Sequence, residues 1–120
     1  MPDSPSTIVE RLPNLVVVRI QHESLDEKNL AAVRAETSAA GAESPQLAVV
    51  LDMTKVSFLP SLSLGGLVQL SREFKARGQR FALSGLQPLV RDTMAITRLD
   101  RLIEINNDLA TLTGPTGTAG

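Results

Sequence analysis

The sequence predicts a single α/β domain with a mixed, mostly parallel β-sheet of about five strands and about four helices. Segments rich in Val and Ile alternate with segments of helical spacing, which is typical of sheets whose crossovers are helices. The 120 residues suit one domain, and 42% hydrophobic with 21% charged residues are ordinary for a globular protein. We place the domain at residues 7–112 and expect flexible termini at 1–6 and 113–120, where small, polar and turn-forming residues gather.

Two strands and a helix open the predicted domain. Residues 7–12 and 14–21 are rich in Val and Ile, and the proline and asparagine between them indicate a tight turn, so the strands should pair antiparallel. Ser24 to Glu27 form a capping box for a helix from Leu25 to Ala40, with Gly41 as its stop. Leu30, Val33 and the alanines should lie on its inner face.

A third strand and a second helix follow. Residues 47–51 form an unbroken apolar run that ends in Asp52, as in a central strand buried on both faces. The helix should begin near Ser61 and end at Gly78, with Glu73 and Arg77 paired four residues apart. Its apolar residues at helical spacing are Leu64, Leu67, Val68 and Phe74.

The last part of the chain predicts two more strands and two helices. The strands are residues 80–84 and 102–105, and a helix between them starts at Pro88, which is tolerated in a first turn. A short helix from Asp108 completes the pattern. The apolar residues that define the helix from Pro88 are Leu89, Val90, Met94 and Leu99.

Composition excludes several kinds of site. The chain has no cysteine, Trp or Tyr and a single histidine, His22, so cysteine-based metal sites, catalytic triads and aromatic stacking platforms are disfavoured. The net charge of −1 gives no reason to expect nucleic acid. We therefore predict a protein that is not an enzyme and that needs no metal and no cofactor.

Two further patterns disfavour a phosphate-binding loop and a membrane location. Gly65-Gly66 lacks the lysine and spacing of a phosphate-binding loop, so we interpret the pair as small residues that let the second helix approach the sheet closely. No stretch is long and apolar enough to insert into a membrane, and the acidic, proline-bearing N-terminus is unlike an export signal. A cytoplasmic location follows as the expectation.

The segment from Val56 to Leu67 is the candidate site. It follows the central strand, where loops of α/β sheets bind ligands and partners, and it turns at Pro60-Ser61 into the second helix. Ser61 is placed to cap that helix, and a phosphate on it would meet the unpaired N–H groups of the first turn. A structural N-cap and a phosphorylation site are both consistent with these residues.

This segment resembles the STAS family, which includes bacterial anti-sigma factor antagonists. The family pattern is a strand ending in Leu-Asp, then Val-x-Phe-[Ile/Leu]-Asp-Ser-[Ser/Ala]-Gly-Leu-Gly-x-Leu and, after a helix, an Arg-Gly turn. The matching residues are Leu51-Asp52, Val56, Phe58-Leu59, Ser61, Leu64-Gly65, Leu67, Arg77-Gly78 and Leu99-Asp100-Arg101-Leu102. Pro60 stands where the family has aspartate, and Ser63 where it has glycine.

The resemblance implies a STAS-like domain that binds an anti-sigma factor with serine kinase activity and so regulates transcription in bacterial signalling. It implies Ser61 as the phosphorylated residue, with phosphorylation blocking the partner. The implied partner-binding residues are Asp52, Ser57, Leu59, Pro60, Ser61, Leu62, Ser63 and Gly65. The alternative is a STAS accessory subunit or scaffold without phosphorylation, as in lipid-transport ATPases or stressosome-type complexes, and a homodimer stays open.

The three phenylalanines, Phe58, Phe74 and Phe81, all fall in the strand–helix–strand unit that contains Ser61. We predict that they are buried there and anchor the site.

Overall fold

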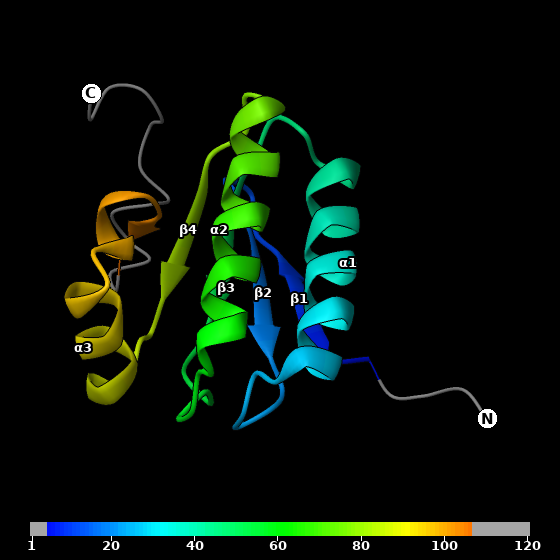
Figure 1. Ribbon diagram of the computed structural model, residues 1–120. Coiled ribbons are helices and arrows are strands. Elements are labelled where there is room, and N and C mark those ends of the chain that lie inside the picture. The colour runs from blue at the N-terminus through cyan, green and yellow to red at the C-terminus, as the bar shows by residue number, and fades with distance from the viewer. Residues whose placement is uncertain (1–4, 107–120) are drawn as a thin grey trace.

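The computed structural model describes residues 5–106 and shows helices packed on a five-stranded sheet (Figure 1). The strands lie in chain order across the sheet, and only the first pair is antiparallel. They are β1 (Thr7–Arg11), β2 (Leu15–Ile20), β3 (Ala48–Asp52), β4 (Phe81–Ser84) and β5 (Glu104–Ile105). The predicted fold class, the antiparallel opening pair and the mostly parallel sheet are confirmed.

The described residues contain three α-helices and one short 3₁₀ turn. They are α1 (Glu27–Glu43), α2 (Ser61–Ala76), α3 (Pro88–Ile96) and η1 (Leu99–Arg101). The count is one lower than the predicted four, and the predicted helix from Asp108 lies outside the described residues. In Figure 1, α1 and α2 run side by side over one face of the sheet, and α3 lies beyond β4.

The start of α1 differs from the predicted capping box. Asp26, not Ser24, is the N-cap, and its carboxylate accepts a hydrogen bond of 2.9 Å from the backbone N–H of Asn29. Ser24 instead forms a parallel bridge with Phe58. The helix therefore begins at Glu27, and the predicted start at Leu25 is wrong by two residues. Leu25 itself is fully buried beneath this turn.

The end of α1 also differs, because Gly41 does not stop the helix. The helix continues to Glu43, and Gly41 is buried against α2. A Cβ atom at Gly41 would lie 2.9 Å from Cζ of Phe74, which is closer than van der Waals contact. Gly41 thus lies inside the helix and gives the Phe74 ring its space.

Gln79 joins the end of α1 to the turn before β4. Its buried side-chain amide donates to the carbonyls of Gly41 at 3.0 Å, Ser44 at 3.0 Å and Leu47 at 2.9 Å. The carbonyls of Gly41 and Ser44 also accept from the N–H groups of Ser44 and Leu47, so the Gln79 amide reinforces the backbone turn that follows α1. The preceding Gly78 has a φ of 73° and follows the end of α2, as predicted.

The sheet is buried on both faces at its centre. The larger core lies between the sheet and the helices and includes Val18, Leu51 and Leu67. A smaller cluster occupies the other face: Leu15, Val17, Ala48, Val50 and Ala82. β3 is thus apolar on both sides, as its unbroken run predicts.

The phenylalanines do not form the predicted anchor. Phe74 and Phe81 stack with their ring centroids 5.0 Å apart, near the C-terminal end of α2 and away from Ser61. Phe58 is 58% exposed, so its predicted burial is wrong. The loop around it turns Val56 and Leu59 toward the core instead.

Candidate functional site

The loop between β3 and α2 (residues 53–60) is tied to the loop between β2 and α1. The N–H groups of Ser57 and Phe58 both donate to the carbonyl of Glu23, at 2.8 and 3.1 Å, and Leu25 N–H donates to the carbonyl of Phe58 at 3.1 Å. Figure 1 shows both loops at the lower end of the molecule, beside the start of α2. The Phe58 backbone is therefore fixed while its side chain stays in solvent.

Buried residues fix the beginning of this loop to the core and to the end of β4. Met53 and Val56 are fully buried, and Met53 N–H donates to the carbonyl of Ser84 at 2.8 Å. The Asp52 carboxylate accepts from the N–H of Thr54 at 2.9 Å and lies 3.4 Å from Nε of Arg19. Asp52 thus shapes the loop from within, and its contact with a partner stays a prediction.

The start of α2 presents Ser61 differently from the prediction. Pro60 occupies the N-cap position with φ −61° and ψ 155°, and no side chain caps the helix. Its carbonyl accepts from Ser63 N–H at 2.9 Å. Ser61 is the first helical residue, so its predicted capping role is wrong. Its exposed hydroxyl has no hydrogen-bond partner within residues 5–106.

The exposed members of this region form one surface, which we call the Ser61 patch. Phe58 and Leu62 are 58% and 60% exposed, so two large apolar side chains lie close together in the sequence at the surface around Ser61. The patch consists of Ser57, Phe58, Ser61, Leu62 and Gly65. It contains no charged side chain.

Two predicted site residues lie beneath the patch. Ser63 is fully buried, and its hydroxyl donates to the carbonyl of Leu25. Leu59 is partly buried and packs against the core. Phe58, by contrast, was not predicted as a site residue, because its apolar character predicted burial. Its nearness to Ser61 in the sequence is the signal that could have identified it.

The glycine pair of α2 has two separate roles. A Cβ at Gly66 would lie 3.0 Å from Cγ of Leu30 and 3.1 Å from its Cδ1, whereas nothing lies within 4 Å of one at Gly65. Gly66 therefore allows a close approach to α1, and the predicted approach to the sheet is wrong. Gly65 leaves the Ser61 patch flat and open.

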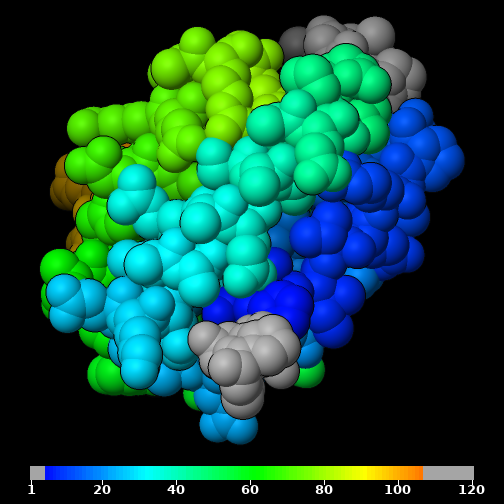
Figure 2. All heavy atoms as spheres, turned by 90° about the vertical axis from the view of Figure 1, so that its right-hand side faces the viewer, coloured from blue at the N-terminus to red at the C-terminus, as the bar shows by residue number. Residues whose placement is uncertain are grey.

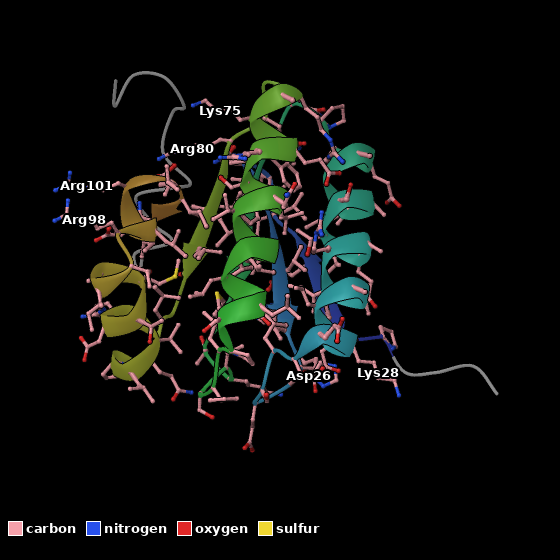
Figure 3. All side chains as sticks on the ribbon, in the orientation of Figure 1. Asp26, Lys28, Lys75, Arg80, Arg98 and Arg101 are labelled. Atoms are coloured by element: carbon pink, nitrogen blue, oxygen red, sulfur yellow. The ribbon has the colours of Figure 1, made fainter. Side chains whose placement is uncertain are left out.

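The dipole of α2 favours an anion at Ser61. Figure 3 shows Lys75, Arg80, Arg98 and Arg101 toward the other end and flank of the molecule, and Asp26 and Lys28 at the start of α1. The first-turn N–H groups of α2 carry the positive end of the helix dipole. A phosphate on Ser61 would lie at that end.

Comparison with known proteins identifies the family. The family model described as STAS domain matches residues 6–112. The chain belongs to the STAS family. An anti-sigma factor antagonist from Mycobacterium paratuberculosis is 26% identical with a TM-score of 0.75, and the match covers 93% of each chain.

Two further solved structures show the same fold. Unphosphorylated SpoIIAA, an anti-sigma factor antagonist, is 22% identical with a TM-score of 0.67, covering 88% of this chain and 91% of that one. The phosphorylated form of the Bacillus protein SpoIIAA is 20% identical with a TM-score of 0.61, covering 88% and 95%.

Residues 5–106 also bear on two other kinds of site. No helix there has the length and apolar composition of a membrane span. No group of three His, Cys, Asp or Glu side chains in that part of the chain is arranged to hold a metal ion.

Proposed function

We propose that this STAS domain is an anti-sigma factor antagonist that binds an anti-sigma factor with serine kinase activity through the Ser61 patch. Phosphorylation of Ser61 by that kinase ends the binding. The observation that carries the proposal is the Ser61 hydroxyl at the start of α2, which has no partner among residues 5–106 and lies near exposed Phe58 and Leu62. The domain acts as a binding module in the cytoplasm, with no catalytic activity of its own, and regulates transcription.

The unmodified patch suits a protein partner. Phe58 and Leu62 offer apolar area that a partner removes from water, and large side chains at the centre of an interface contribute most to affinity. The backbone bonds from Phe58 to Glu23 and Leu25 hold this area in place before binding. A pre-organised surface loses less conformational entropy on association.

A phosphate on Ser61 would change the patch without changing the fold. It adds about two negative charges near neutral pH, and the helix N-terminus tolerates them. Burying such a group against an apolar partner surface is costly unless the partner supplies hydrogen bonds. Binding should therefore weaken while the domain stays folded.

Pro60 affects how a kinase recognises the site. Its ring fixes φ and it lacks both an N–H and an acidic group, so it presents Ser61 in one backbone conformation. Recognition then depends on shape and on the apolar neighbours of Ser61.

Phosphorylation is tested with the cognate kinase and ATP. Peptide mass spectrometry should place phosphate on Ser61, and Ser61→Ala should abolish the modification. Ser57 is the exposed control and Ser63 the buried one. Phosphate absent from Ser61 would refute the switch.

A second function is a permanently bound accessory subunit or scaffold, which Pro60 and exposed Leu62 favour. The two functions differ in their response to Ser61→Asp. The switch requires the affinity for the partner to fall at least tenfold, about 1.4 kcal/mol. Unchanged affinity would support the permanent interface.

A further inference from the structure

Arg34 lies on α1 in a shallow depression between α1 and α2. One hollow of about 380 Å³ is lined by Arg34 together with Leu30, Leu62 and Gly66. A second, of about 340 Å³, continues past Arg34 to Ser38 and Glu73. We call the two together the α1–α2 trough, and Figure 2 shows α1 at the molecular surface between β1 and α2.

The guanidinium of Arg34 lacks a partner within residues 5–106. Its Nε atom is buried and makes no hydrogen bond, and Arg34 forms no ion pair there. Glu73 lines the same trough but is held by Arg77 at 3.0 Å and by the Ser38 hydroxyl at 2.5 Å. A buried donor without an acceptor is costly and calls for an explanation.

The trough is continuous with the Ser61 patch. Leu62 belongs to the patch and also lines the first hollow, whose lining includes the small residues Gly66 and Ala31 and, in addition, Glu27 and Gln69. A segment bound on the patch can therefore extend along this hollow toward Arg34.

We propose that Arg34 receives a carboxylate of the anti-sigma factor, from an Asp or Glu side chain whose apolar neighbour packs against Leu62. The occupant follows from charge complementarity, because a guanidinium matches a carboxylate with directed hydrogen bonds. This inference rests on the proposed function and adds the chemistry of its partner.

The same contact connects binding to phosphorylation. A carboxylate bound on Arg34 lies along the surface that begins at Leu62, the residue after Ser61. Phosphate on Ser61 would repel that partner segment as well as hydrate the patch. The loss of affinity on phosphorylation then has an electrostatic component, and this component decreases as the salt concentration increases.

The test compares Arg34→Met with Arg91→Met, which removes one exposed positive charge from α3, away from the trough. Affinity for the anti-sigma factor kinase is measured by calorimetry, and thermal unfolding is measured for each variant. We expect Arg34→Met to lose at least tenfold in affinity without a lower unfolding midpoint, and Arg91→Met to bind like the wild type. Unchanged affinity of Arg34→Met, or a parallel loss of stability, would overturn the proposal.

A second measurement needs no protein partner, so it separates this proposal from the proposed function. The ¹⁵N-labelled protein is titrated with sodium acetate against sodium chloride at equal ionic strength. The Nε–H signal of Arg34 should shift saturably with acetate only, and that of Arg91 should not. If no anti-sigma factor binds the wild type, the proposed function fails while an acetate shift still supports the carboxylate site; no shift overturns it.

Discussion

The adjacent glycines Gly65 and Gly66 should respond in opposite directions to the same substitution. Replacing glycine with alanine inside a helix stabilises it by roughly 0.5–1 kcal/mol, because the unfolded chain loses freedom. Gly65 has open space for a methyl group, so Gly65→Ala should show that full gain. It therefore calibrates the helix contribution for its neighbour.

At Gly66 the new methyl group meets Leu30. Cγ of Leu30 would be 3.0 Å away and Cδ1 3.1 Å, so rotating one methyl group does not relieve the clash. Adding a methyl group to a packed contact costs about 1–3 kcal/mol. Gly66→Ala should therefore be about 1–3 kcal/mol less stable than Gly65→Ala, and less stable than the wild type.

Urea unfolding followed by circular dichroism measures both variants in the same buffer. A difference of 1 kcal/mol corresponds to about 4 °C in the melting temperature of a domain of this size, so a thermal scan provides a check. If both variants gained stability equally, α1 and α2 would not be in the close contact described.

Three other predictions follow from single contacts. Phe58→Ala should change the free energy of unfolding by less than about 1 kcal/mol, since the ring is exposed, but should reduce partner affinity at least tenfold; a large loss of stability would contradict this. Ser63→Ala leaves the carbonyl of Leu25 without the Ser63 hydroxyl and should lower the free energy of unfolding in urea by about 1–3 kcal/mol. Ser61→Ala should change it by less than about 0.5 kcal/mol, and equal effects of the two variants would refute the burial of Ser63. Gln79→Met removes a buried donor shared by three carbonyls, two of which keep a backbone partner, so it should cost about 1–3 kcal/mol and speed amide exchange at the end of α1; wild-type exchange there would argue against the linkage.

Local chemistry explains which expectations the structure confirms. Gly78 follows α2 because the chain needs a positive φ there, and Pro88 begins α3 because its ring suits a first turn. β3 is buried on both faces because an unbroken apolar run suits no other position in a sheet. Each of these depends on one residue or on a short run.

The wrong expectations concern choices between neighbouring residues of similar chemistry. Ser24 and Asp26 are both good N-caps, and the bridge from Ser24 to Phe58 leaves the cap to Asp26. Gly41 has the residue type of a helix stop, but the Phe74 ring determines its role. Such outcomes depend on contacts between residues more than thirty positions apart.

The sequence by itself determined the alternation of strands and helices, the fold class and the position of Ser61 at the beginning of α2. These features follow from periodicity and backbone preference, which act over a few residues. Only the tertiary structure decided that Phe58 is exposed, that Ser63 is buried and that Arg34 has no partner in the described part of the chain. Exposure and pairing are properties of packed elements, because the atoms that cover or satisfy a side chain come from distant parts of the chain.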